Sequence, residues 1–181
     1  MHKNVIFLDI DGVLQPGYLQ RRFKHDLEAL QLHLAEKYDR PEYKQYDKYD
    51  LGAIYYDWDQ ESVDNLKLLL NTRMAVIVLS SAWRRLKTID SLKDYFRIHD
   101  LDTFLVDFTP VMDGLCRSVE IETYLNAHPE IGNFLILDDV DFKFSSKFPN
   151  HFVNTGRENR ITDEHLKKSL EILSRAKISQ R

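Results

Sequence analysis

The sequence contains little cysteine, glycine or proline, and each scarcity excludes a class of protein. Cys116 is the one cysteine among 181 residues, so no disulfide can form within the chain, which fits a reducing compartment. Six glycines and five prolines are too few for long disordered segments. Because the length and the 43% share of hydrophobic residues allow one sizeable core, we expect a single domain over residues 1–181.

Long apolar runs and an excess of positive charge are also missing. No run approaches the roughly 20 residues that span a bilayer, and the N-terminus leads into a β-strand rather than a signal peptide. We therefore expect a cytoplasmic protein with no membrane partner. The net charge of −4 gives no support to tight polynucleotide binding by overall attraction, although a local basic patch stays open. The seven histidines lack paired ligand spacing and no Walker loop is present, which disfavours a zinc site and an ATP-driven kinase.

The chain does contain apolar strands that alternate with amphipathic helices. Three continuous apolar runs are typical of strands buried on both faces of a parallel sheet, at residues 5–8, 75–79 and 134–137. Two weaker strand candidates are 104–108 and 151–154. Helical patterns cover 62–70, 89–98, 119–125 and 162–173. This alternation predicts βαβ units and a doubly wound parallel α/β sheet.

Residues 17–57 interrupt the alternation after the first strand. Within them, 23–38 has a helical pattern, and a polar stretch follows that is crowded with tyrosines: Tyr43, Tyr46, Tyr49, Tyr55 and Tyr56. We interpret the segment as a small insertion over the carboxyl edge of the sheet. The tyrosines either line a substrate mouth or pack the insertion onto the body, and we favour packing.

Two aspartates end the first predicted strand. Asp9 and Asp11 are one residue apart and Gly12 follows, in the sequence FLDIDGVL. Ligands of α/β sheets bind just beyond the carboxyl ends of the strands, and glycine permits a sharp turn there. Two close carboxylates repel each other unless a cation lies between them. Mg²⁺ takes oxygen ligands and suits phosphate chemistry, so this motif predicts a magnesium site.

Two further strand ends carry polar residues. Asp138 and Asp139 follow the run at 134–137 and supply two more carboxylates. Ser80 and Ser81 follow the run at 75–79, where hydroxyl and backbone donors can bind phosphate oxygens. We favour Ser80 over Ser81 because it comes first after the strand. Asp141 we interpret as a helix cap or turn residue, although it could also reach the residues around the metal ligands.

The DIDGVL motif, the strand-terminal serine and the strand-terminal Asp-Asp pair, in this order, resemble the haloacid dehalogenase (HAD) superfamily over nearly the whole chain. The stretches SSAWR, RSVEIETYL and FLILDD are most similar to a smaller HAD branch found fused to or alongside RNA-repair enzymes. The resemblance implies a HAD-like Rossmannoid fold with a minimal cap. It also implies a Mg²⁺-dependent phosphohydrolase that works through an aspartyl-phosphate.

The resemblance assigns roles residue by residue. Asp9 would be the nucleophile and a metal ligand. Asp11 would be the general acid and then the base, with its backbone carbonyl at the metal. Ser80 would bind the phosphate. Asp138 would bind Mg²⁺, with Asp139 as a further ligand or beside one.

The superfamily also places a cation at the start of the helix before the last acidic strand. Arg117 fits this position, where lysine is commoner, and a guanidinium can bridge a carboxylate and a phosphate. Lys93 and Arg97 are weaker competitors, because both lie within a predicted helix.

Other candidates have two interpretations each. Trp83, Arg84 and Arg85 could stack on a base and contact phosphates, or Trp83 could pack beneath the loop. Arg157 and Arg160 could extend an anion path, although a charged surface loop is the favoured interpretation.

The substrate stays open between two kinds of phosphoester. A minimal cap leaves the site open to bulky partners, and the resemblance favours a polynucleotide 3′- or 5′-phosphate. The acidic net charge favours nucleotides or other small phosphoesters. A catalytically silent HAD-like binding module is disfavoured because Asp9 and Asp11 are both present. A dehalogenase is disfavoured because its chemistry needs neither Asp11 nor the metal cluster.

Overall fold

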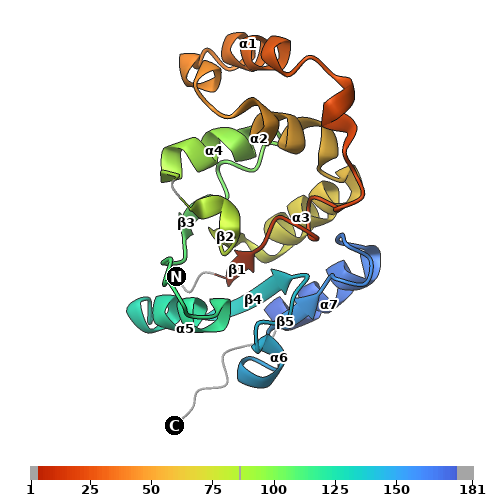
Figure 1. The fold of residues 1–181 in the computed structure, drawn as a ribbon. Helices are drawn as coiled ribbons and strands as arrows, with labels where there is room; N and C mark the ends of the chain where they lie inside the picture. The colour runs from red at the N-terminus through yellow and green to blue at the C-terminus, as the bar shows by residue number, and fades with distance from the viewer. Residues whose placement is uncertain (1–3, 86, 175–181) are drawn as a thin grey trace.

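The computed structural model describes residues 4–85 and 87–174, whose strands form a five-stranded, all-parallel sheet. The strands are β1 (Asn4–Leu8), β2 (Ala75–Leu79), β3 (Leu105–Phe108), β4 (Asn133–Asp138) and β5 (Phe152–Asn154). Their order in the sheet is β3-β2-β1-β4-β5, with β1 at the centre (Figure 1). This confirms the predicted parallel α/β fold.

The register of the sheet brings the strand ends together. Leu8 of β1 pairs with Leu79 of β2 and with Leu137 of β4. The three strands therefore end level with one another, and the residues that follow them share one edge. A parallel sheet places every carboxyl end at that edge, so the polar residues after β1, β2 and β4 converge there.

Helices cover both faces of the sheet. One face packs against α3 (Gln60–Arg73), α4 (Ile89–Arg97) and α7 (Asp163–Ser174), and the other against α5 (Arg117–Ala127) and α6 (Phe144–Lys147). In β1, Ile6 and Leu8 belong to the first core, whereas Val5 and Phe7 belong to the second. Both faces of the strand are buried, which is why its sequence is continuously apolar. No helix of the described residues is both long and apolar enough to cross a bilayer.

The predicted helix at 23–38 begins later in the structure. Residues Arg21–Lys24 form a 3₁₀ turn, η1, and α1 covers Leu27–Lys37. Asp26 separates the two, because its carboxylate accepts the backbone N–H groups of Glu28 and Ala29 at 3.0 Å each. An aspartate that satisfies these free donors starts a new helix at this point.

The insertion continues through η2 (Pro41–Lys44), α2 (Lys48–Gly52) and η3 (Ala53–Asp57), a π-helical turn. Figure 1 shows α2 next to α4, with α1 farther from the sheet. Tyr43 donates its hydroxyl to the Asp94 carbonyl at 2.6 Å, and Tyr46 donates to the Asp94 carboxylate at 2.7 Å. These two tyrosines pack the insertion onto α4, as favoured from the sequence. Tyr49 and Tyr55 are instead exposed.

Candidate active site

The carboxyl edge of the sheet brings the predicted site residues to one place. Asp9 follows β1 directly, Ser80 follows β2, and Asp138 is the last residue of β4. Arg117 is the first residue of α5 and reaches across this edge. Its Nη1 donates to Asp9 Oδ2 at 2.7 Å and to Asp138 Oδ2 at 2.5 Å. One guanidinium nitrogen therefore links the acids that end two neighbouring strands.

A third carboxylate joins this pair. One oxygen each of Asp9, Asp138 and Asp139 lies within 4.8 Å of the others. Asp9 is 4% exposed and Asp138 is 1% exposed. Gly12 has a φ of +71°, and a Cβ added there would lie 2.4 Å from Asp139 Oδ2. The glycine of the motif is therefore needed both for its left-handed conformation and to leave room for Asp139.

The electrostatics of the cluster show an excess of negative charge. Burial and the charge of Asp9 raise the pKa of Asp138 to about 7, against the opposing effect of Arg117. Burial and Asp9 also raise the pKa of Asp139. Burial alone would lower the pKa of Arg117, but Asp9 and Asp138 outweigh it and raise that pKa. Three carboxylates face one guanidinium, so an added divalent cation would relieve their repulsion.

Asp11 lies outside the three-carboxylate cluster. Its Oδ2 accepts the indole N–H of Trp83 at 3.0 Å. Burial raises the pKa of Asp11, the Trp83 N–H opposes the rise, and the charge of Asp9 adds to it. The Trp83 ring also packs edge-on against Tyr95, with ring centroids 6.4 Å apart. The contact of Trp83 with Asp11 was missed from the sequence, because 72 residues separate the two in the chain.

The two serines have different surroundings. Ser80 is 1% exposed, and its hydroxyl has no hydrogen-bond partner among the described residues. The Ser81 hydroxyl accepts the Trp83 backbone N–H at 3.4 Å, at the start of the 3₁₀ turn η4 (Ala82–Arg84). A buried hydroxyl without a partner costs free energy unless a ligand meets it. The geometry favours Ser80 as the hydroxyl available to a ligand.

Arg84 is occupied by structural contacts, which contradicts the hypothesis that it meets phosphates. It is 4% exposed and pairs with Glu120 of α5 at 2.5 Å. It also donates to the carbonyls of Ser81 at 2.5 Å and Thr109 at 3.0 Å. Arg84 therefore ties the loops after β2 and β3 to the first turn of α5.

The remaining candidates have partners other than the three clustered carboxylates. Arg85 is exposed and within 3.5 Å of Asp113, and it lines a hollow of about 170 Å³ together with Arg117. Arg97 pairs with Asp94 and Asp102, and Lys93 is on the same helix α4. Asp141 accepts the backbone N–H of Ser145 in the turn that begins α6, as a turn residue should. Arg160 pairs with Glu61, and the Arg157 side chain is 93% exposed, so both belong to a charged surface loop.

One supporting residue comes from the last strand. Thr155 follows β5, is fully buried, and donates its hydroxyl to the Gly12 carbonyl at 2.8 Å. This bond fixes the turn that carries Asp9 and Asp11. Thr155 could have been identified as a residue of the site from the sequence, because it comes directly after the predicted strand at 151–154.

Acids at the ends of two central strands, a serine after a third, and a basic residue that opens the helix before the second acidic strand form the arrangement that the HAD resemblance implies. Over residues 5–166, the sequence matches the family described as the HAD domain in Swiss Army Knife RNA repair proteins. The match covers most of the chain, which therefore belongs to this family within the HAD superfamily. No curated protein matches the sequence.

Membership of this superfamily of hydrolases and phosphatases implies a divalent-metal site. Asp9, Asp138 and Asp139 form a group of carboxylates that can hold the ion. The fit is chemical as well as spatial, because clustered carboxylate oxygens are the ligands that hard cations prefer. Burial is the main cause of the raised pKa of Asp138 and the charge of Asp9 adds to it, so a nearby cation would favour the ionised carboxylate.

Proposed function

We propose that the protein is a Mg²⁺-dependent phosphohydrolase that cleaves phosphomonoesters at nucleic-acid ends through an aspartyl-phosphate on Asp9. We further propose that residues 1–181 act as one domain, with residues 17–57 as its minimal cap. The observation that carries the proposal is the bridge from Arg117 to Asp9 and Asp138, beside the unpartnered hydroxyl of Ser80. A cation, a carboxylate nucleophile and a free hydroxyl at one strand edge suit a phosphoryl group.

Asp9 is the proposed nucleophile. Its Oδ1 accepts the Ile10 backbone N–H at 2.9 Å, which fixes the carboxylate. The other oxygen, Oδ2, faces Arg117. Attack of a carboxylate oxygen on phosphorus forms the Asp9 acyl-phosphate bond as the bond from phosphorus to the leaving oxygen breaks. Arg117 and the Ser80 hydroxyl bind the oxygens of the transferring group.

Asp11 is the proposed proton carrier. In its protonated form it donates to the leaving oxygen, which its raised pKa favours. The resulting carboxylate then takes a proton from the water that attacks the acyl-phosphate. The phosphorus to Asp9 bond breaks, inorganic phosphate forms, and both aspartates return to their starting states.

Asp9, Asp138 and Asp139 would hold the metal ion, with the backbone carbonyl of Asp11 as a further proposed ligand. Bound Mg²⁺ would offset the charge of the phosphate and of the three carboxylates during attack. Asp138 contributes through its burial, because a desolvated carboxylate interacts more strongly with a cation than an exposed one.

The family description supports a nucleic-acid end as the substrate, since the relatives are RNA repair proteins. Nucleotides and other small phosphoesters are the alternative, which the net charge of −4 favours. A Mg²⁺-dependent assay should compare oligonucleotides phosphorylated at the 3′ or 5′ end with mononucleotides and sugar phosphates. Faster hydrolysis of mononucleotides than of oligonucleotides would contradict the nucleic-acid assignment.

Replacement of the nucleophile tests the chemistry. Asp9→Asn should abolish hydrolysis of a generic aryl phosphate while circular dichroism shows an unchanged fold. The matched control is Asp107→Asn on β3, a carboxylate that accepts the Tyr124 hydroxyl away from the cluster. Full activity in Asp9→Asn would show that another group attacks the phosphorus.

A further inference from the structure

Two large aromatic side chains of the insertion are exposed next to each other. Phe23 of η1 is 59% exposed and Tyr49 of α2 is 52% exposed. Their ring centroids lie 6.4 Å apart and the ring planes are tilted by 44°. They line a hollow of about 410 Å³ together with Arg22, His25, Asp26, Leu27, Glu28 and Lys48. The pair presents large apolar ring faces on which the flat ring of a ligand could stack.

A positively charged side chain lies over each of the two rings. The Arg22 guanidinium lies 4.8 Å from the centre of the Phe23 ring, and the Lys48 ammonium lies 5.7 Å from that of Tyr49. Arg21 and Lys24 flank Phe23 in the sequence and are exposed. Neither forms an ion pair with another described residue. Stacking faces beside free positive charges suit a ligand that has flat rings and phosphates.

The acidic residues of the hollow have partners within the protein. The Asp26 carboxylate accepts two backbone N–H groups at the start of α1. Glu28 pairs with Lys48 at 2.8 Å. The two cations that line the hollow, Arg22 and Lys48, are paired with Asp57 and Glu28. The charges available for an anion are therefore those of Arg21 and Lys24, which belong to the same turn η1 as Phe23 but lie outside the lining.

The aromatic pair rests on a rigid base. Asp57 is fully buried and binds Arg22 twice, at 2.5 Å through the side chain and at 3.1 Å through the backbone. A Cβ added at Gly52 would lie 2.7 Å from Leu27 Cδ2, so α2 approaches α1 closely. A preformed surface loses little conformational freedom when a ligand binds.

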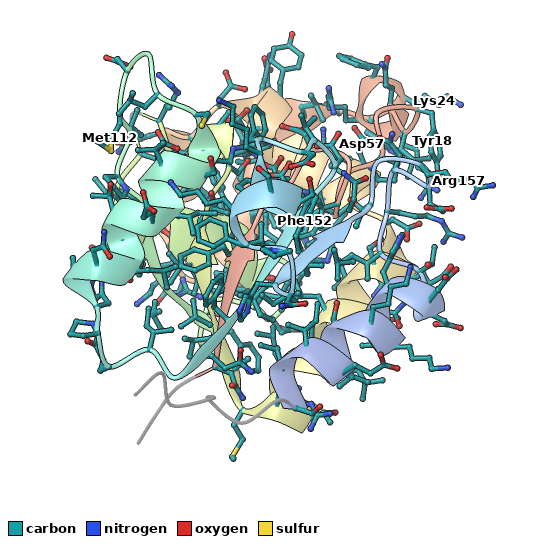
Figure 2. All side chains as sticks on the ribbon, turned by 90° about the horizontal axis from the view of Figure 1, so that it is seen from below. Tyr18, Lys24, Asp57, Met112, Phe152 and Arg157 are labelled. Atoms are coloured by element: carbon teal, nitrogen blue, oxygen red, sulfur yellow. The ribbon has the colours of Figure 1, made fainter. Side chains whose placement is uncertain are left out.

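The hollow is joined to the candidate active site by a short stretch of chain. Residues 12–20 connect the Asp9 motif to η1, and Tyr18 within them is 66% exposed. The Gly17 backbone N–H donates to Asn159 at 3.3 Å, which links this stretch to the loop that carries Arg157. Figure 2 shows Tyr18, Lys24 and Arg157 at the same side of the molecule.

We propose that this hollow is a docking site for single-stranded RNA. One base stacks on Phe23 and Tyr49, and backbone phosphates lie against Arg21 and Lys24. A single strand fits because a duplex keeps its base faces stacked on each other. The choice of RNA as the polymer rests on the proposed function, whereas the docking site itself rests on the aromatic and basic groups.

The test measures binding separately from hydrolysis. A fluorescein-labelled, unphosphorylated oligoribonucleotide is titrated with Asp9→Asn protein and followed by fluorescence anisotropy. Adding both Phe23→Ala and Tyr49→Ala to the Asp9→Asn protein should weaken binding about tenfold or more, the order expected for the loss of one stacked base. The control Leu32→Ala removes a side chain that is 58% exposed on α1 of the same insertion, and should leave affinity unchanged.

Lys24→Gln tests the basic component. The plot of log affinity against log salt concentration has a negative slope. Lys24→Gln should make that slope less steep by about 0.7, the value for one phosphate contact on a single strand. The control Lys44→Gln removes an exposed lysine of η2 and should leave the slope unchanged. An unchanged slope in Lys24→Gln would contradict the phosphate contact.

The remaining outcomes separate this proposal from the proposed function. Loss of RNA affinity in the Phe23 and Tyr49 double variant supports the docking site even if Asp9→Asn leaves phosphatase activity intact. With Asp9 present, the double variant should hydrolyse an aryl phosphate at the normal rate. Wild-type affinity in the double variant, or equal affinity for duplex RNA, overturns the docking site. Tighter binding of single-stranded DNA overturns the assignment to RNA.

Discussion

Replacement of Asp138 by asparagine should stabilise the metal-free protein at alkaline pH. Asp138 is 1% exposed, and burial with the charge of Asp9 raises its pKa to about 7. The folded state therefore holds this proton more tightly than the unfolded state, whose pKa is close to 3.8. Stability falls as pH rises from about 4 to about 7, because folding then requires an ionised carboxylate to be buried.

The size of the effect follows from the same values. The interval between 3.8 and about 7 corresponds to at most about 4 kcal/mol, at about 1.4 kcal/mol per pKa unit. Asparagine removes this penalty but weakens the contact with Arg117, at a cost of about 1 to 2 kcal/mol. Asp138→Asn should thus be about 2 kcal/mol more stable than the parent at about pH 8, and should lose that advantage by about pH 4.5.

Urea unfolding followed by tryptophan fluorescence in the presence of EDTA measures this difference. Asp141→Asn is a control from the following loop, where hydrogen bonds from Ser145 lower the pKa of the carboxyl. Asp141→Asn should lower the free energy of unfolding at neutral pH and leave it unchanged in acid. This pH dependence is opposite in sign to the one expected for Asp138→Asn. A stability difference for Asp138→Asn that does not vary with pH would refute the reasoning.

Addition of Mg²⁺ at about pH 8 completes this test. A ligand at one hundred times its Kd stabilises the parent by about 2.7 kcal/mol. Asp138→Asn should gain much less, because one of three carboxylate ligands is gone. Equal stabilisation of parent and variant would show that Asp138 does not bind the ion.

Three further substitutions have definite expected outcomes. Ser80→Ala should lower kcat/KM for an aryl phosphate by about tenfold or more, with little change in urea midpoint, because the hydroxyl lacks a partner among the described residues. Gly12→Ala should reduce stability, because alanine is strained at the φ of +71°. It should also reduce Mg²⁺ affinity, because the new Cβ displaces Asp139. Thermal unfolding measured with and without Mg²⁺ checks both effects. Arg84→Ala should destabilise the fold by about 3 to 5 kcal/mol because it leaves Glu120 buried without its cation, and urea unfolding would contradict this if the midpoint stayed unchanged.

Much of the fold follows from the order of apolar runs along the chain. Strands buried on both faces have continuous apolar sequences, and all five strand runs were predicted close to their observed bounds. The helix at 23–38 was predicted as one element, because its pattern spans both η1 and α1. Asp26 interrupts it through hydrogen bonds to backbone groups, which apolar periodicity does not detect.

The hydrogen-bond and ion-pair partners of each polar side chain could not be predicted from the pattern of apolar residues. Arg84 and Arg117 are both arginines near the predicted site, yet Arg84 binds Glu120 and two carbonyl oxygens while Arg117 faces the carboxylates. Ser80 and Ser81 are neighbours, and the hydroxyl of Ser81 alone caps a turn. Which of two similar groups is free depends on partners that are distant in sequence.

The sequence by itself determined which acids and hydroxyls follow which strands. Parallel strands end at one edge of their sheet, so Asp9, Ser80 and Asp138 had to lie along that edge once the strands paired. The tertiary structure decided that β1 lies between β2 and β4, that Arg117 bridges the acids, and that Trp83 holds Asp11. It also decided how far each carboxylate is buried, and so how strongly the cluster needs a cation. Desolvation and charge depend on what surrounds a side chain in space, and a linear sequence does not specify those surroundings.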